Sequence, residues 1–372
     1  MQLKNLVEFS AAGAGKTYSI CKKSIELRDN QGLTSLIVTY TNKGKLAVET
    51  EFKKQNIGVL SNKVVIKTLY DFFLSDLAKP YQNYFLSTNQ IKGVDFEKLY
   101  GFVNKYPDSS RRRYIESNGN VYPNELSKLI LRLEELSGGL ITKRLSEIYG
   151  AIFFDEIQDL SGYDLNIIEM IMLTPINVYC VGDYKQATYK TNNSQKNSAV
   201  SGRNCLAFFN ALKEKRICDI TFNNISRRCN GLICQFANEL YPTEINMVPY
   251  DNKETGHDGV FAICESDIDS YYNLFSPQML MYDKDSNNYG HHSLNFGICK
   301  GLTFDRVIIS PNKPFKVYVE SNKSLSSPEK YYVAVTRARF SVAIIFSKPP
   351  QKYREIIEMA DGEKIFKVYR IK

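Results

Sequence analysis

Short runs of apolar residues, rich in β-branched side chains, recur along the chain, and each is followed by a polar turn and a longer helical pattern. Continuous apolar runs of this kind are typical of strands buried in parallel sheets. Two series of strands are expected, the first at residues 6–10, 35–39, 64–67, 151–154 and 178–181, and the second at residues 260–264, 279–282, 306–310 and 342–346. Because the strands alternate with helices, the pattern predicts an α/β fold, and the two series predict two such domains.

The pattern changes between residues 79 and 141, where the chain is polar, rich in tyrosine and mostly helical. Residues 124–139 place apolar side chains at helical spacing. We therefore expect a helical insertion in the first domain. The predicted boundaries are residues 1–78 with 142–215 for the first domain, 79–141 for the insertion and 216–372 for the second domain.

Composition supports a folded protein without a membrane partner. Of the 372 residues, 43% are hydrophobic and 24% are charged, as in ordinary globular domains. No apolar run reaches the roughly 18 residues of a membrane-spanning helix, and no secretion signal is visible. The eight cysteines form no CxxC pair, which favours reduced thiols and a cytoplasmic location.

The net charge of +8 is concentrated near the end of the sequence. Residues 316–372 contain 12 Lys and Arg against 6 Asp and Glu. A basic region of this kind fits a polyanionic partner such as nucleic acid. A lysine-rich surface that serves only solubility explains the charge equally well.

The sequence SAAGAGKT (10–17) lies directly after a strand pattern and before a helical one. A strand–loop–helix turn of this kind aims backbone N–H groups and the helix dipole at phosphates. Ser10 stands where the usual GxxxxGK[ST] pattern has its first glycine. We expect Lys16 to reach the β- and γ-phosphates and the Thr17 hydroxyl to bind Mg²⁺. The other residues expected at the nucleotide in this loop are Ala12, Gly13, Ala14 and Gly15.

Acidic and amide side chains follow the next predicted strands. In AIFFDEIQDL (151–160) the strand ends at Asp155, a candidate Mg²⁺ ligand, and Glu156, a candidate base for the attacking water. Gln186, in VGDYKQATY (181–189), is placed to contact both the γ-phosphate and that water. Solvated acids at a strand end and a polar loop glutamine are the alternatives.

Arg228 and Arg337 both fall in the second series of strands. Phosphoryl transfer develops negative charge that arginine side chains stabilise. Arginines on a second domain would complete a nucleotide site when the domains close. Charge alone would make both of them surface residues, so their motif context decides between the two interpretations.

That context comes from the order of the motifs. After the phosphate loop come VTYTNKGK (38–45), IKTLYDFF (66–73), FFDEIQDL (153–160), VGDYKQATY, ISRRCNGLICQFAN (225–238), KGLTFDRVII (300–309) and YYVAVTRAR (331–339). In order and character this set closely resembles the UvrD/Rep-like superfamily 1A DNA helicases. KGLTFD and YVAVTRAR are especially diagnostic.

The resemblance implies two RecA-like parallel-sheet domains with ATP in the cleft between them and single-stranded DNA across their top. It also implies Mg²⁺-ATP hydrolysis coupled to 3′→5′ movement along the strand. By position, Gln186 is similar to the residue that senses the γ-phosphate, and Arg228 and Arg337 are similar to the two arginines that clamp it. Gly301, in KGLTFD, is expected beside the nucleotide on the same basis.

The base site departs from the family pattern. The family's adenine-binding glutamine lies about twenty residues before the lysine of the phosphate loop, and only 15 residues precede Lys16, so we expect that element to be missing. The family sandwiches adenine between an arginine after GKT and a tyrosine before the later arginine. Here Tyr18 and Arg227 hold those positions with the chemistry exchanged. Both side chains stack on π faces, so we expect adenine binding to survive, with packing of Tyr18 in the helix core as the alternative.

The predicted DNA-binding surface has fewer aromatic residues for base stacking than is usual in the family. Thr191 stands where an aromatic residue is usual, and Tyr70 stands where histidine is common. Tyr40, Tyr70 and Tyr189 are the candidates for stacking on bases, against the alternative that they are packing residues. The run RRR (111–113) either contacts phosphates or is a solvated charge run.

Only 72 positions separate Arg228 from Lys300, where full-length relatives insert a further domain that regulates unwinding. We therefore expect the chain to move along single strands and to unwind duplexes weakly. A partner protein such as a nuclease is a hypothesis. A second hypothesis is an ATP-switched regulatory subunit that senses DNA for a partner enzyme. A small-molecule kinase built on the phosphate loop would not explain KGLTFD or VAVTRAR.

Overall fold

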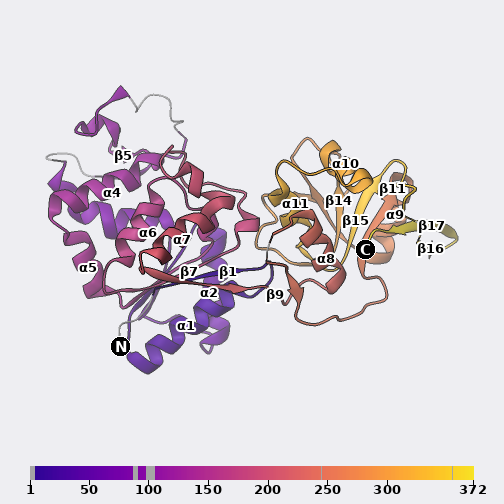
Figure 1. Cartoon of the computed structure of the whole chain (residues 1–372), viewed down its shortest axis with the longest axis horizontal. Helices are drawn as coiled ribbons and strands as arrows, with labels where there is room; N and C mark the ends of the chain where they lie inside the picture. Colours follow the sequence, from indigo (N-terminus) through magenta and orange to yellow (C-terminus); the bar gives the residue numbers. More distant parts are fainter. Residues whose placement is uncertain (1–4, 87–90, 98–104, 244, 354) are drawn as a thin grey trace. The chain divides into compact units, whose positions relative to one another are not determined.

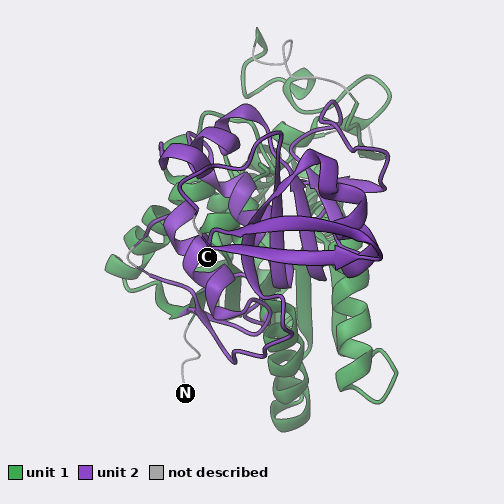
Figure 2. Cartoon of the chain, turned by 90° about the vertical axis from the view of Figure 1, so that its right-hand side faces the viewer, with its two compact units in different colours: residues 1–9, 16–222 green, residues 10–15, 223–372 purple. Residues whose placement is uncertain are grey.

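The computed structural model describes residues 5–86, 91–97, 105–243, 245–353 and 355–372. The chain forms two compact units, drawn in green and purple in Figure 2. The first unit contains Met1–Phe9 and Lys16–Phe222, and the second contains Ser10–Gly15 and Asn223–Lys372. The loop between the first strand and the first helix thus makes its contacts mainly with the second unit.

The first unit is built on a six-stranded sheet in the order β3-β2-β6-β7-β1-β8. Figure 1 labels β7 and β1, which are neighbours in this sheet. Neighbouring strands from β3 to β1 run parallel. The strands are β1 (Asn5–Ser10), β2 (Ser35–Thr39), β3 (Val64–Thr68), β6 (Ala151–Phe154), β7 (Asn177–Gly182) and β8 (Cys218–Asn223). The main helices are α1 (Lys16–Gln31), α2 (Asn42–Gln55), α3 (Leu69–Phe72), α4 (Pro123–Ser137), α5 (Leu140–Ile148), α6 (Asp164–Met172) and α7 (Cys205–Glu214). Shorter elements are η1 (Phe73–Ala78), η2 (Lys79–Tyr84), β4 (Gly93–Val94), η4 (Arg111–Arg113), β5 (Asn120–Val121), η5 (Ile157–Asp159), η6 (Tyr184–Gln186), η7 (Ser198–Val200) and η8 (Gly202–Asn204).

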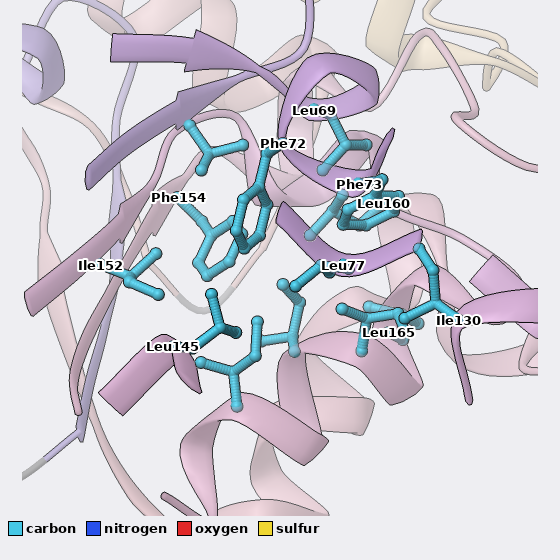
Figure 3. Packing of buried hydrophobic residues seen from close by; sticks show 14 of the residues in the cluster. Leu69, Phe72, Phe73, Leu77, Ile130, Leu145, Ile152, Phe154, Leu160 and Leu165 are labelled. Carbon is cyan, nitrogen blue, oxygen red and sulfur yellow. The ribbon is translucent and has the colours of Figure 1, made fainter. Parts of the chain in front are cut away.

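Helices cover both faces of this sheet because its strands are apolar on both sides. Alternate residues of one strand point to opposite faces, so Phe153 packs with α1 and α2 while Phe154 packs with α3 to α7. Figure 3 shows the second of these clusters, where Phe72 and Phe154 lie side by side above Leu145. Carboxyl ends of parallel strands meet at one edge of a sheet, which gathers the loops that follow them.

The second unit is a seven-stranded sheet in the order β13-β12-β14-β15-β11-β17-β16. Strands β13 to β11 are parallel, and the last two form an antiparallel hairpin at one edge. The strands are β11 (Gly259–Cys264), β12 (Gln278–Met281), β13 (Ser293–Asn295), β14 (Phe304–Ser310), β15 (Ala338–Phe346), β16 (Ile356–Asp361) and β17 (Lys364–Arg370), beside a separate pair of β9 (Ile225–Ser226) and β10 (Val248–Pro249). The helical elements are α8 (Gly231–Leu240), η9 (Glu265–Asp267), α9 (Ile268–Phe275), α10 (Lys313–Ser321) and α11 (Pro328–Val335).

The predicted α/β class is confirmed, and a strand lies at each of the nine predicted positions. The hairpin β16–β17 was not predicted, because its residues alternate in exposure and form no continuous apolar run. The domain boundaries stay predictions. Helix α4, inside the proposed insertion, packs its apolar side chains into the same cluster as the first sheet.

Two expectations about composition can be compared with the described residues. All eight cysteines are free, and seven of them are buried. None of the helices in the described ranges is long and apolar enough to cross a membrane.

Candidate nucleotide and nucleic-acid site

Asp155 and Glu156 follow β6 directly, at the carboxyl edge of the first sheet. The Asp155 backbone N–H donates to the Val38 carbonyl of the neighbouring strand at 2.9 Å, and its carboxylate accepts the Glu156 N–H, also at 2.9 Å. Glu156 has a φ of 57°, in the left-handed region that non-glycine residues seldom adopt. Such a backbone persists only where the surroundings hold it, and it is common at functional sites.

Gln158 connects this acid to the next strand. Its side chain is fully buried, and its amide nitrogen donates to the Glu156 carboxylate. Its amide oxygen accepts the Asp183 N–H at 3.0 Å, at the end of β7. The approach requires a glycine at position 182, where a Cβ would lie 2.5 Å from the Gln158 oxygen.

Asp183 is hydrogen-bonded to Gln158 on one side and to Gln186 on the other. Its carboxylate accepts the Gln186 side-chain amide at 2.7 Å and the Lys185 N–H at 3.0 Å. Burial raises the pKa of Asp183, and the positive charge of Lys16 opposes that rise. The structure therefore brings Lys16, Glu156 and Gln186 together in the first unit, as the strand order predicts.

Lys16 and Thr17 form the first turn of α1. Burial raises the pKa of Cys21, one turn further along, and the charges of Glu51 and Asp155 add to the rise. The Asp155 carboxylate thus lies close enough to the start of this helix to act on it electrostatically.

The oxygen donors at this position fit a magnesium ion that arrives with a nucleotide. Mg²⁺ is usually bound through one or two protein oxygens, with phosphates and waters filling the other positions. The Asp155 carboxylate and the partly exposed Thr17 hydroxyl supply that kind of donor. The residues described contain no group of three or more His, Cys, Asp or Glu side chains able to hold a metal alone.

The loop Ser10–Gly15 is bound by a segment of the second unit. The Ser226 hydroxyl donates to the Ala12 carbonyl at 2.7 Å, and the Arg227 N–H donates to the Gly13 carbonyl at 3.0 Å. Gly13 has a φ of 77°, and a Cβ there would lie 2.5 Å from the Cβ of Arg228. Only glycine satisfies both the backbone conformation and this close approach.

Arg228 and Arg337 lie near each other within the second unit. Burial and the charge of Arg337 both lower the pKa of Arg228. Arg337 is 1% exposed and donates to the carbonyls of Val333 and Leu302, while Arg228 donates to the Thr336 carbonyl at 2.9 Å. Two adjacent guanidinium groups repel each other, so an anionic ligand such as a phosphate would stabilise both. The alternative of an ordinary surface residue does not fit the burial of Arg337, whereas Arg228 is only partly buried.

The remaining predicted nucleotide residues lie on the surface of their units. Tyr18 is 54% exposed, so it does not pack in the helix core. Arg227 is exposed, with its guanidinium 4.4 Å from the centre of the Tyr250 ring. Gly301 is exposed, with a φ of 85°, immediately before the Leu302 carbonyl that Arg337 binds.

Two of the three candidate stacking residues lie together in the first unit. The rings of Tyr40 and Tyr70 are 6.4 Å apart, and the Tyr70 hydroxyl donates to the Thr191 carbonyl at 3.0 Å. Phe96, 62% exposed, meets the Tyr70 ring edge-on at 4.8 Å. Tyr189, the third candidate, is 43% exposed.

Sequence reasoning missed Gln158, Asp183 and Phe96. The first two stand inside the motifs FFDEIQDL and VGDYKQATY, so their position was a usable signal. Phe96 lies in the insertion, where no motif marks it. In the run RRR, Arg113 forms an ion pair with Glu125 at 3.0 Å, which gives that residue a structural partner.

Comparisons with known families match most of this arrangement. Residues 48–200 match the UvrD/REP helicase N-terminal domain, and residues 139–346 match the viral superfamily 1 RNA helicase core domain. No curated protein sequence matches the chain. Among solved structures, the arterivirus nonstructural protein 10 helicase in complex with DNA matches at 14% identity with a TM-score of 0.47.

That structural match covers 94% of this chain, and the chain spans 62% of the length of the arterivirus protein. The family matches carry more weight, because the second covers more than half of the chain. Together the two matches cover residues 48–346, from within α2 to the end of β15. The chain therefore belongs to the superfamily 1 helicases, and its residues 48–200 are similar to the UvrD/REP helicase N-terminal domain.

Proposed function

We propose that the chain is a Mg²⁺-ATP-dependent translocase that moves 3′→5′ along single-stranded DNA. The observation that carries the proposal is the hydrogen-bonded connection from Glu156 through Gln158 and Asp183 to Gln186. This connection links Glu156, the proposed base for the attacking water, with Gln186, the proposed sensor of the γ-phosphate. A change at either end is transmitted to the other through buried groups with fixed geometry.

Each group has a defined task in this proposal. Glu156 accepts the proton of the attacking water, and Lys16 binds the β- and γ-phosphates. Arg228 and Arg337 stabilise the charge that develops on the transferred phosphoryl group. Thr17 and Asp155 would hold a Mg²⁺ ion, which would neutralise charge on the phosphates. The direction of movement rests on the family resemblance.

Aromatic residues support the choice of a single-stranded partner. Tyr40, Tyr70 and Tyr189 are the proposed stacking residues, and stacking of a base on an aromatic ring does not depend on the base sequence. The basic segment 316–372 adds a non-specific attraction for phosphates.

The test is steady-state ATP hydrolysis by the purified chain with and without unstructured oligothymidine. We expect several-fold stimulation by the oligonucleotide. Glu156→Gln should still bind ATP but hydrolyse it about 10²- to 10⁴-fold more slowly, the usual contribution of a general base. Glu135→Gln is the matched control, since Glu135 is an exposed residue of α4.

Normal hydrolysis by Glu156→Gln would contradict the assigned role. Stimulation by oligouridine but not by oligothymidine would contradict the choice of DNA.

One observation favours a second candidate, an ATP-switched regulatory subunit that senses DNA for a partner such as a nuclease. The stretch between Arg228 and Lys300 is occupied by α8, β11, α9, β12 and β13, all of which belong to the second unit itself. Among the described residues 228–243 and 245–300, no additional domain intervenes that could regulate unwinding. A switch of this kind would hydrolyse ATP without displacing a protein roadblock from a labelled single strand, whereas a translocase would displace it.

A further inference from the structure

Arg227 and Tyr250 form a cation–π pair on the surface of the second unit. The Arg227 guanidinium lies 4.4 Å from the centre of the Tyr250 ring, and Tyr250 is 60% exposed. Within the described ranges no carboxylate forms an ion pair with Arg227. An exposed arginine that stacks on tyrosine keeps its charge and its planar surface available to a ligand.

Backbone hydrogen bonds fix both members of the pair. The strands β9 and β10 run parallel, with Pro249 opposite Ser226. The Tyr250 N–H donates to the Ser226 carbonyl at 2.7 Å, so Tyr250 is bound to the residue that precedes Arg227. The main chain at Tyr250 is therefore held next to the main chain at Arg227, which brings the two side chains within reach of each other.

The same short segment binds the phosphate loop. The Arg227 N–H donates to the Gly13 carbonyl at 3.0 Å, and the Ser226 hydroxyl donates to the Ala12 carbonyl at 2.7 Å. The backbone of Arg227 is thus tied directly to the loop expected at the phosphates. A base that stacks on its guanidinium would belong to a nucleotide whose phosphates reach that loop.

We propose that Tyr250 is a positioning residue for the nucleotide base. It covers one face of the Arg227 guanidinium and leaves the other face to stack on the purine of a bound nucleoside triphosphate. A guanidinium held flat in this way loses less side-chain freedom when the base binds. The inference rests on the proposed ATP site and adds a residue that lies outside the motifs identified in the sequence.

Tyr250 should contribute to the binding of the base and not to the binding of the phosphates. We therefore compare the affinities of ATP and of inorganic tripolyphosphate, each measured by displacement of a fluorescent ATP analogue from the full chain. Tyr250→Ala should weaken ATP binding about two- to fivefold, the range of an exposed cation–π contact, and leave tripolyphosphate binding unchanged. Tyr250→Phe, which keeps the ring, should bind both ligands as the unmodified chain does.

Tyr84→Ala is the control, because Tyr84 is a 49% exposed tyrosine of the first unit. The affinity of the Tyr84→Ala chain for ATP should equal that of the unmodified chain. Equal weakening of ATP and tripolyphosphate by Tyr250→Ala would show a structural role and overturn the inference. No change in either affinity would also overturn it. If the unmodified chain bound neither ligand, the proposed nucleotide site itself would be wrong, and that result is distinct from both.

Discussion

Asp164, the first residue of α6, has a buried carboxylate that accepts hydrogen bonds from the Ser127 hydroxyl and the Asn192 amide. Asn192 follows Thr191, whose carbonyl binds Tyr70. Burial raises the pKa of Asp164 to about 6, although its hydrogen bonds oppose the rise. A single residue thus joins α4, α6 and the loop that supports the proposed DNA-binding surface.

This pKa predicts how stability depends on pH. Below about pH 3 the carboxyl is protonated in both the folded and the unfolded chain. As the pH rises towards 6 the unfolded chain releases its proton first, so the free energy of unfolding falls, by at most about 3 kcal/mol for a shift of two units. Above pH 6 the loss is constant. Asp164→Asn does not titrate, so its stability relative to the unmodified chain should increase between pH 4 and pH 6.

Urea unfolding at several pH values measures the difference. Ser266→Ala, an exposed substitution in the second unit, provides the control for general pH effects. A difference that stays flat between pH 4 and pH 7 would contradict the raised pKa.

At the scale of elements, the ends of β6 and β7 are joined by side chains and not by strand pairing. Gln158, on η5, reaches Asp183 only because β7 ends in Gly182. A Cβ on residue 182 would also lie 2.6 Å from Cγ1 of Ile157. The connection between the two predicted catalytic motifs therefore depends on a residue that has no side chain.

Gly182→Ala should slow ATP hydrolysis while the chain stays folded. Overpacking of a well-packed site costs about 1–3 kcal/mol, and displacement of Gln158 would misplace Glu156, so a loss of about tenfold or more in kcat is expected. The KM for ATP should change less, because Lys16 and the phosphate loop are not moved. Gly93→Ala, whose Cβ would lie at an ordinary contact distance of 3.4 Å from the Asn120 side-chain oxygen, is a matched control. A normal kcat in Gly182→Ala would show that the connection is not needed.

Helix α3 presents Tyr70 to the proposed DNA-binding surface, between Tyr40 and Phe96. Tyr70→Ala should weaken binding of oligothymidine by about 1–3 kcal/mol, the value of one base stacked on an aromatic ring. Tyr70→Phe keeps the ring and loses only the bond to the Thr191 carbonyl, so it should bind nearly as tightly. Fluorescence anisotropy at constant salt concentration measures both affinities. Equal weakening by the two variants would assign the effect to the hydrogen bond and not to stacking.

In each of the two units, the described elements form one main sheet and the helices that cover it. Between Arg228 and Lys300 the chain contributes the strands β11, β12 and β13 to its sheet, and the described residues of this stretch form no further domain. We therefore expect ATP-driven movement along single strands with little strand separation. The measurement compares the rate of movement on labelled single strands with the unwinding of a short duplex that carries a 3′ single-stranded tail. Efficient unwinding by the isolated chain would contradict this expectation.

The local pattern of the sequence was sufficient for the main elements of the fold. Each of the nine predicted strands is a continuous apolar run, and such a run has few other places in a folded chain than the interior of a parallel sheet. The hairpin β16–β17 lacks that signal, because Ile356, Glu358 and Ala360 alternate with partly buried neighbours on an edge strand. Pairing with β11 stabilises it, and that pairing joins residues distant in sequence.

The fold class, the order of the motifs and most of the residue types that the proposed chemistry needs could be predicted from the amino-acid pattern alone. Lys16, Glu156 and Gln186 follow strands whose carboxyl ends had to meet, because parallel strands share one edge. Only the tertiary structure decided that Gln158 and Asp183 join them, that Phe96 lies against Tyr70, and that Tyr250 lies beneath Arg227. These contacts depend on distances between residues far apart in the chain, which neither periodicity nor motif spacing encodes.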